Sequence, residues 1–334
     1  MSRNSSPPIM RLAHPMAFGA FLQEVGAPVH RHFRRQGLPV FCDNPNEFVP
    51  VRRAWSFFDA ASRAEDPSLG WHVGRFVGDN NLSDSLLRLL QTAPTLYQAL
   101  KRLIRHVSSE ASHLQLGILE RRDDILFFAH YPDMKNARGY SDSQAYQLAV
   151  YIDLIRHFLG KRWVPEEIGI EHPVVPAVVK EHFPGSRVLP RQRAGFVSVP
   201  RDRLHIAPPV RQSEPTRDKP LVLAKDFSFP DTLAAVIRAY LPDGYPSAKT
   251  VAPLMDISVR TMARRLVDHG LNYQSVIDKV RFNLARELLQ EATVTVGDVA
   301  IATGFSDSTH FARMFRRTGG LSPLEYRRSF RDSC

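Results

Sequence analysis

The last hundred residues contain a short helical pattern, a glycine and a second short helical pattern, and this feature restricts the fold of the chain more than any other. The pattern runs from Thr295 to Arg317. The first segment has an apolar side formed by Val299, Ala300 and Ile301. Gly304 can adopt the left-handed backbone conformation that ends a helix at little cost. Two helices joined by so tight a turn are predicted to form a helix-turn-helix.

The second segment separates apolar residues from small, polar and basic ones. Spacings of three and four place three residues on the inner side, namely Phe311, Met314 and Phe315. Ser306 is a suitable N-cap for this helix, and Phe305 is predicted to fill the angle between the helices. The predicted outer face contains Ser308, Thr309, Ala312, Arg313 and Arg316. Such a face suits close approach to base edges in the major groove of DNA.

An earlier stretch has the same plan. Its first helix is predicted over 247–255, with Val251, Ala252 and Leu254 on the apolar side. Residues 255–257 form the turn, and Ser258 can cap the next helix, whose inner side contains Met262 and Leu266. The residues predicted to lie outward or on the flank are Arg260, Thr261, Ala263, Arg264 and Arg265.

A helix predicted over 273–290 joins the two patterns. Its 18 residues span about 27 Å at about 1.5 Å per residue. Successive major-groove faces on one side of DNA are about 34 Å apart, so this helix could hold two reading helices one turn apart. Its predicted buried face contains Val276, Ile277, Val280, Leu284 and Leu288. The alternative for either pair alone is an ordinary helical bundle with exposed charged faces.

Bulk charge does not distinguish these interpretations. The chain has a net charge of +10, but residues 227–334 hold 14 Lys and Arg against 11 Asp and Glu, a net of +3. The DNA-binding hypothesis therefore depends on where individual arginines point. The candidate DNA-contacting residues are Ser258, Arg260, Thr261, Ala263, Arg264, Arg265, Ser306, Ser308, Thr309, Arg313, Arg316 and Arg317.

The rest of the chain predicts a separate α+β domain. Four prolines in 207–220 indicate a linker, so we predict an effector-binding and dimerisation domain over 1–206, a linker over 207–228 and an all-α DNA-binding domain over 229–334. Helices are expected over 49–64, 69–77, 94–110 and 142–159. A hairpin is expected from 114–119 and 125–129, with further strands over 168–171 and 195–199.

Several residues suggest other chemistry only weakly. His30 and His32 lack a nearby Cys or carboxylate cluster with ligand spacing, so no metal is expected. No phosphate loop or nucleophile motif is present, so no cofactor and no catalytic residue are expected. Cys42 is interpreted as a packed thiol rather than a redox sensor. Four aromatic residues are interpreted as core, with an effector pocket as the alternative: Trp71, Tyr131, Tyr140 and Tyr146.

The two cysteines and the missing signal-peptide and membrane-span patterns predict a cytoplasmic protein that does not associate with a membrane.

The C-terminal part resembles the DNA-binding region of the AraC/XylS transcription regulators. The resemblance rests on residues 258–266, 280–289, 299–307, 311–317 and 320–327. It implies that Arg260, Ala263 and Arg264 read bases in the first pair, and that Ser308, Thr309 and Arg313 do so in the second. Ala263 departs from the polar residue common there, and its methyl group can contact a thymine methyl but cannot read a hydrogen-bond donor or acceptor. His310 is also unusual, and it is interpreted as facing solvent or partly packed, with a phosphate contact as the alternative.

The N-terminal part resembles the effector domain of the ornithine-utilisation-regulator type. This resemblance rests on residues 55–58 and 69–74, the hairpin and the helix that starts at Asp142. It implies an α+β domain and not a cupin-like barrel. The combined expectation is a sequence-specific, effector-responsive activator that binds double-stranded promoter DNA, works with RNA polymerase and forms a homodimer. The alternatives are a non-specific architectural DNA binder and an enzyme with a DNA-targeting tail.

Overall fold

The computed structural model describes residues 6–80, 89, 92–132, 134, 136–209, 227–291 and 293–331, which form two compact units. The sheet unit comprises residues 13–32 and 54–226, and the helical unit comprises residues 1–12, 33–53 and 227–334. Residues 33–53 thus belong to the same unit as the last hundred residues, which nothing in the sequence pattern indicated. Residues 210–226 of the predicted linker lie outside the described part.

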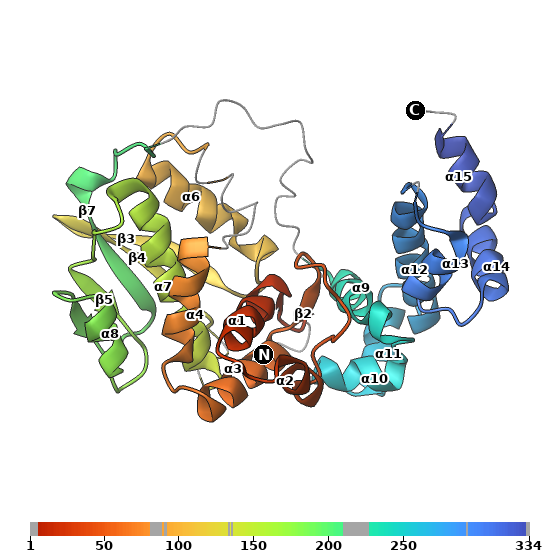
Figure 1. Ribbon diagram of the computed structural model, residues 1–334, viewed down its shortest axis with the longest axis horizontal. Helices are drawn as coiled ribbons and strands as arrows, with labels where there is room; N and C mark the ends of the chain where they lie inside the picture. The colour runs from red at the N-terminus through yellow and green to blue at the C-terminus, as the bar shows by residue number, and fades with distance from the viewer. Residues whose placement is uncertain are drawn as a thin grey trace. The chain divides into compact units, whose positions relative to one another are not determined.

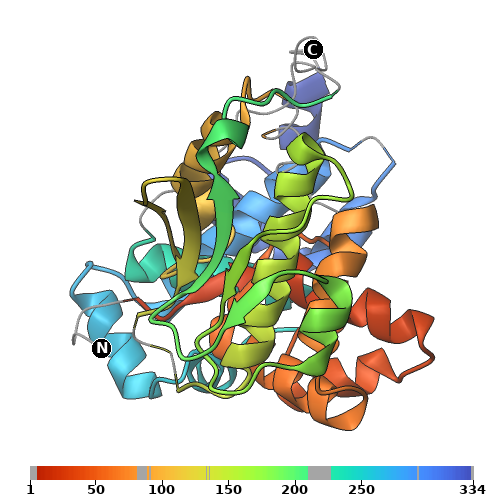
Figure 2. The ribbon, with the colours of Figure 1, turned by 90° about the vertical axis from the view of Figure 1, so that its left-hand side faces the viewer.

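The sheet unit is built on five strands. Their order is β3-β4-β7-β5-β6, and only the β5–β6 pair is parallel. The strands are β3 (Gln115–Glu120), β4 (Asp124–His130), β5 (Glu167–Gly169), β6 (Arg187–Leu189) and β7 (Gly195–Pro200). Figure 2 shows them side by side. Among the described residues β3 and β6 are open edges, so the sheet is not a closed barrel and the predicted α+β class is confirmed.

The helices of this unit confirm most of the predicted ones. The helices are α1 (Ala13–Glu24), α3 (Val51–Ala64), α4 (Leu69–Asn80), α6 (Leu96–His106), α7 (Tyr140–Leu159) and α8 (Ala177–His182), with short 3₁₀ turns η1 (Val107–Ser109) and η2 (Arg201–Arg203). Helix α6 begins two residues later than predicted, because the Thr95 side chain accepts a hydrogen bond from the Gln98 amide and acts as the N-cap. Helices α1 and α8 and strand β6 were not predicted.

Two glycines allow α4 to lie unusually close to α7. A Cβ at Gly70 would be 2.3 Å from the carbonyl oxygen of Asp142, and a Cβ at Gly74 would be 2.5 Å from the Cβ of Ala149. The two glycines are four residues apart and so share one face of α4. The contact fixes the start of α4 against the start of α7, while α7 packs on strands β4 and β7 (Figure 1).

The four aromatic residues considered above are all buried. Tyr131 is 1% exposed, Trp71 2%, Tyr146 6% and Tyr140 8%. Trp55 packs edge-on against Tyr131, and Phe18 stacks on Phe58 within the same core. Core packing is therefore confirmed for these side chains. Trp71 in addition lines a cavity, which is described below.

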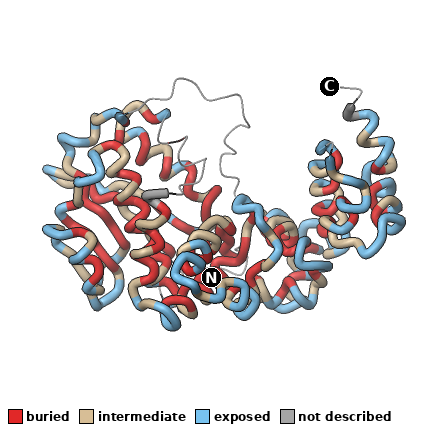
Figure 3. The backbone as a smooth tube through the Cα atoms, in the orientation of Figure 1, coloured by how far each residue is buried: buried red, intermediate tan, exposed pale blue. Residues whose placement is uncertain are grey.

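The helical unit consists of short helices and one strand pair. Its elements are β1 (Ile9–Arg11), β2 (Phe48–Pro50), α9 (Phe229–Tyr240), η3 (Leu241–Asp243), α10 (Ala248–Leu254), α11 (Val259–Val267), α12 (Tyr273–Leu289), α13 (Val296–Ala302), α14 (Ser308–Gly319) and α15 (Pro323–Arg331). Helix α2 (Val29–Gln36) crosses the limit between the units, and so does α3, whose first three residues belong to the helical unit. Figure 3 shows alternating buried and exposed stretches along α9 to α15, as expected for amphipathic helices. No described helix is long and apolar enough to span a bilayer.

Candidate nucleic-acid interface

Helices α13 and α14 form the second predicted pair around a compact core. The buried residues of this core are Ala285, Leu289, Val299, Ala300, Phe311, Met314 and Phe315. Thr295 and Asp298 form a capping box at the start of α13, and these hydrogen bonds lower the pKa of the Asp298 carboxyl. Gly304 ends α13 with φ of +75°, as its position in the sequence predicted.

The predicted N-cap of α14 was wrong by one residue. The side chain of Asp307, rather than that of Ser306, accepts a hydrogen bond from the His310 amide at 2.8 Å. This backbone hydrogen bond is the main reason that the pKa of Asp307 is lowered. Ser306 is exposed in the turn. A carboxylate competes well for this position because it also interacts favourably with the helix dipole.

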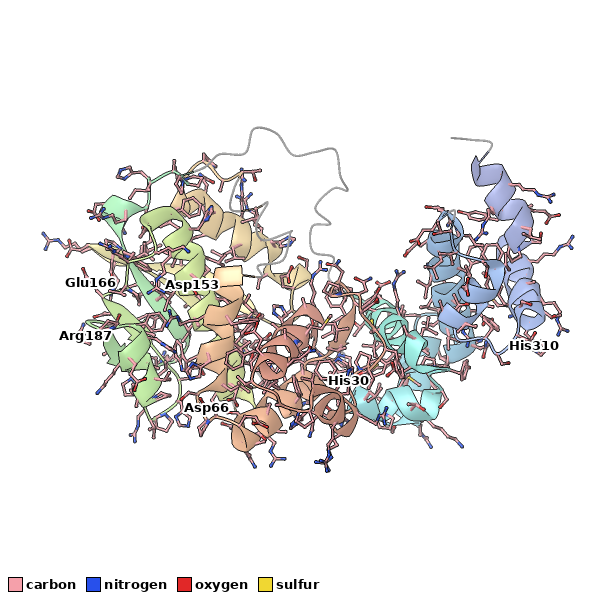
Figure 4. All side chains as sticks on the ribbon, in the orientation of Figure 1. His30, Asp66, Asp153, Glu166, Arg187 and His310 are labelled. Carbon is pink, nitrogen blue, oxygen red and sulfur yellow. The ribbon has the colours of Figure 1, made fainter. Side chains whose placement is uncertain are left out.

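The outer face of α14 is accessible at most of the predicted positions. Ser308, Thr309, Arg313 and Arg316 are exposed, whereas Ala312 is half-buried. His310 is 64% exposed, and its Nδ1 atom lies 2.6 Å from the Asp307 carboxylate (Figure 4). This position agrees with a solvent-facing histidine held near its own helix cap. Arg317 is exposed too, but its Nη2 donates to Asp278 at 2.6 Å.

The first pair, α10 and α11, has the predicted cap and the predicted inner side. The Ser258 hydroxyl accepts a hydrogen bond from the Thr261 amide at 3.0 Å. Met262 is 1% exposed and Leu266 is fully buried. Of the candidates on α11, Arg260, Ala263 and Arg264 are exposed.

Two flanking candidates on α11 are partly withdrawn from solvent. Thr261 is half-buried, and its hydroxyl lies 2.9 Å from that of Ser258. Arg265 is half-buried, with its guanidinium 5.2 Å from the centroid of the Phe229 ring. The guanidinium groups of four arginines form no hydrogen bond or ion pair with the described residues, namely those of Arg260, Arg264, Arg313 and Arg316. Each reading helix therefore presents two guanidinium groups that an anionic partner could bind.

Helix α12 joins the two pairs, and its buried face differs from the predicted one. Val276, Ile277 and Val280 are buried as expected, but Leu284 and Leu288 are only half-buried. The remaining buried positions are Arg281, Ala285 and Leu289. Arg281 was missed because an arginine on an amphipathic helix is ordinarily placed on the solvent side.

Arg281 connects the two helix pairs from within. Its Nη2 donates to the carbonyl oxygen of Gly304 at 2.8 Å, in the turn of the second pair. Its guanidinium lies 4.2 Å from the ring centroid of Phe305 and 4.6 Å from that of Tyr245, which precedes α10. Burial lowers the pKa of Arg281. The two aromatic rings and the carbonyl dipole compensate for part of the lost hydration of this cation.

The first pair is also supported by residues 33–53, which we call the N-terminal segment. Arg53 donates to the carbonyl oxygens of Pro253 at 2.6 Å and Leu254 at 3.4 Å, at the end of α10. Asp256, in the turn of the first pair, has φ of +54° and lies 3.4 Å from Arg52 and 3.6 Å from Arg53. A cation at the C-terminus of a helix can hydrogen-bond the last carbonyl groups of the helix and interacts favourably with the negative end of the helix dipole.

Further polar contacts attach the same segment to α9 and η3. The Asp243 carboxylate accepts hydrogen bonds from the amides of Val40 and Phe41, each at 2.8 Å. The Tyr240 hydroxyl donates to the carbonyl oxygen of Gly37 at 2.6 Å. Arg238 bridges Glu47 and Glu287, and the hydrogen bond to Glu287 is the main cause of its raised pKa. The N-terminal segment is therefore an integral part of the helical unit.

The other candidate chemistry finds little support. Within the described ranges no group of three or more His, Cys, Asp or Glu side chains is arranged to hold a metal ion. Burial raises the pKa of the Cys42 thiol to about 11, which keeps it protonated near neutral pH. This agrees with a packed thiol.

Comparison with known families identifies both halves of the chain. The family described as the arabinose-binding domain of AraC transcription regulators, N-terminal, matches residues 26–204, and a helix-turn-helix domain family matches residues 251–329. The first match alone covers more than half of the 334 residues.

Curated relatives match over about a quarter of this chain. The transcriptional regulator VqsM of Pseudomonas aeruginosa is 38% identical over 90 residues, which is 27% of this chain and 28% of that protein. The transcriptional activator RhaS of an Enterobacter species is 39% identical over 95 residues, 27% of this chain and 34% of that protein. The ornithine utilization regulator of Pseudomonas aeruginosa is 35% identical over 86 residues, 26% and 25% of the two chains. The chain thus matches about a third or less of the length of these relatives.

Solved structures include the transcriptional regulator CdpR of Pseudomonas aeruginosa, with 20% identity, a TM-score of 0.38 and coverage of 89% of this chain and 96% of that chain. The DNA-binding domain of AdpA in complex with a target DNA is 28% identical, with a TM-score of 0.28 and coverage of 31% and 94%. The N-terminal family model matches more than half of this chain, and the helix-turn-helix family matches its C-terminal part. This chain therefore belongs to the AraC family of transcription regulators.

Proposed function

We propose that the chain is a sequence-specific, effector-responsive regulator that binds double-stranded promoter DNA through α11 and α14. The observation that supports this most directly is the pair of reading helices on one connecting helix. Each helix has two exposed arginines whose guanidinium groups form no hydrogen bond or ion pair with the described residues. Arginine in this setting can bond the O6 and N7 atoms of guanine in the major groove or a phosphate oxygen. The exposed Ser258, before α11, and Ser308 and Thr309, at the start of α14, would contact the same DNA.

The proposed contact residues follow from these positions. Base contacts are proposed for Arg260, Arg264, Ser308, Thr309 and Arg313, and a thymine-methyl contact for Ala263. Contacts with the phosphate backbone of the DNA are proposed for Arg316, Ser258 and Ser306. Thr261, Arg265 and Arg317 are retained as flanking candidates, and Arg265 and Arg317 would have to leave Phe229 and Asp278 to reach DNA.

The remaining features of the proposal rest on relatedness. The activator role, with RNA polymerase as the partner at the promoter, draws on the similarity to the activator RhaS. Effector binding and dimerisation are proposed for residues 1–206, with DNA binding over 229–334 and a linker over 207–228. A cytoplasmic location fits a protein that acts on promoter DNA.

The decisive test compares specific and non-specific DNA at a fixed salt concentration. The full chain should select a bipartite site from a random DNA library, and it should bind unrelated DNA on the order of 10³-fold more weakly. Near-equal affinity for all sequences would establish an architectural DNA binder instead. Inserting five base pairs between the half-sites should abolish joint binding, because it places them on opposite sides of the duplex.

The Arg313→Ala substitution tests the assignment of single residues. It should weaken binding to the selected site by about 1–3 kcal/mol and relax the base preference at one position, as measured by competition with single-base variants. Arg122→Ala provides the control, because Arg122 is exposed on the β3–β4 turn of the sheet unit and carries the same charge. An equal loss of affinity for every DNA sequence would make Arg313 a phosphate contact.

A further inference from the structure

The sheet unit contains a half-open cavity of about 240 Å³ that the DNA-binding function does not use. It lies where the end of α3, the starts of α4 and α7 and the residues after β5 meet. Its apolar wall includes Trp71 and Ile170, which are 2% and 4% exposed. The volume equals that of about eight water molecules in the liquid, so the cavity suits a small molecule.

The lining of this cavity includes one carboxylate, that of Asp142. Asp142 is half-buried in the first turn of α7. The hydroxyl of the buried Ser62, in the same cavity wall, donates a hydrogen bond to the carbonyl oxygen of Asp66 at 3.1 Å. Among the described residues no Lys, Arg or His side chain lies within ion-pair distance of Asp142; besides the larger effect of burial, Asp59 at longer range raises its pKa and Arg63 lowers it. The buried Gln144 adds a neutral polar group to the same wall.

The basic residues at the cavity are engaged elsewhere. Arg63 is 63% exposed and is paired with Asp59 at 2.9 Å. The Nδ1 atom of the exposed His172 accepts a hydrogen bond from the Val174 amide at 3.1 Å. An anionic ligand would therefore meet the Asp142 carboxylate with no unpaired cation beside it among the described residues, whereas a cationic ligand would supply the missing partner.

The energetics of Asp142 point the same way. A carboxylate in the first turn of a helix is ordinarily stabilised by the helix dipole, which lowers its pKa. Here desolvation by burial outweighs that effect and raises the pKa to about 6. The fold thus keeps a poorly solvated carboxylate in a cavity wall, an arrangement common at binding sites.

We propose that this cavity binds a small organic cation, with its ammonium group against Asp142 and its apolar body against Trp71 and Ile170. Ser62 and Gln144 already form hydrogen bonds within the fold, to the Asp66 carbonyl and to Glu171, so Asp142 is the group proposed to hold the ammonium. This inference rests on the proposed effector role of the N-terminal part and specifies the chemical class of the effector. The site itself is formed by the sheet unit and does not depend on DNA.

Thermal shift and titration calorimetry on the full chain test the proposal with matched probes at equal ionic strength. The cations are butylammonium, 1,4-diaminobutane and choline, and the comparison compounds are butyrate and butanol. At least one cation should raise the melting temperature, because a ligand of the folded state stabilises it by mass action. Asp142→Asn should weaken that binding at least tenfold, whereas Asp202→Asn, an exposed carboxylate outside the cavity, should leave it unchanged.

Two results would overturn the assignment: no cation acts, or the effect persists in Asp142→Asn. Stabilisation by butyrate equal to that by the cations would also overturn it. Promoter binding of Asp142→Asn without ligand, measured in parallel, separates this failure from a failure of the DNA-binding function.

The pH dependence of stability gives an independent check. Because the folded-state pKa of Asp142 is about 6 and that of an unfolded Asp is about 3.9, the folded chain binds the proton more tightly. This stabilisation is complete below about pH 4 and is lost as the pH rises through about 6. Asp142→Asn should therefore melt at a higher temperature than the natural chain at pH 7, and at a similar temperature near pH 4. A lower melting temperature at pH 7 would mean that Asp142 only stabilises the helix terminus.

Discussion

At the scale of single residues, Arg281 shows how one buried charge can organise two binding elements. Its hydrogen bond to Gly304 and its two aromatic neighbours, Phe305 and Tyr245, come from both helix pairs. Arg281→Met keeps the length and the apolar part of the side chain but removes these polar contacts. We expect a loss of about 2 kcal/mol or more in the stability of the helical unit, together with weaker DNA binding.

Circular dichroism during urea unfolding and DNA titration measure the two effects. Lys279→Met is the matched control, since Lys279 is an exposed cation on the same helix and should change stability by less than about 0.5 kcal/mol. Equal effects of the two substitutions would show that Arg281 acts through net charge alone.

At the scale of elements, the close contact of α4 with α7 depends on two missing side chains. Gly74→Ala would place a Cβ 2.5 Å from the Cβ of Ala149 and 2.6 Å from the carbonyl oxygen of Tyr146. Because both neighbours belong to a packed helix, we expect a loss of about 1–3 kcal/mol. Tryptophan fluorescence measures it, since Trp55, Trp71 and Trp163 are the three tryptophans of the chain and all lie in the sheet unit.

Gly297→Ala, followed by circular dichroism because no tryptophan lies in the helical unit, is the control for an added Cβ that meets no close neighbour. Its Cβ would have no heavy atom nearer than 3.6 Å, and alanine favours the helical state of α13 by up to about 1 kcal/mol. Stabilisation or no change in Gly74→Ala would show that α4 and α7 can move apart without cost.

At the scale of the whole molecule, the N-terminal segment links a distant part of the sequence to the first helix pair. Arg53→Ala removes the hydrogen bonds to Pro253 and Leu254 and the ion pair with Asp256, which together hold the end of α10 and its turn. We expect DNA affinity to fall by about threefold to tenfold. The lost charged hydrogen bonds hold the end of α10, and the position of α11 depends on that end.

Arg35→Ala tests whether charge alone explains such a loss. Arg35 is an exposed arginine of the same segment, and its removal should leave the affinity within about twofold. If Arg53→Ala bound DNA as tightly as the natural chain, the N-terminal segment would have no role in positioning the first pair.

The sequence by itself determined the elements whose signals are local. The reading helices, the Ser258 cap and the Gly304 turn follow from spacings of three and four residues and from the chemistry of single positions. The inner residues Met262, Leu266, Phe311, Met314 and Phe315 were predicted in the same way and are buried.

Only the tertiary structure decided the features that depend on distant neighbours. Arg281 is buried because residues 23 and 36 positions away in the sequence supply its partners. The attachment of residues 33–53 and the cavity around Asp142 likewise depend on which groups the fold brings together, whereas the choice of Asp307 over Ser306 as cap is made between neighbouring residues. Periodicity reports which side of an element is apolar, but not what that side contacts, so these features could not be derived from the sequence alone.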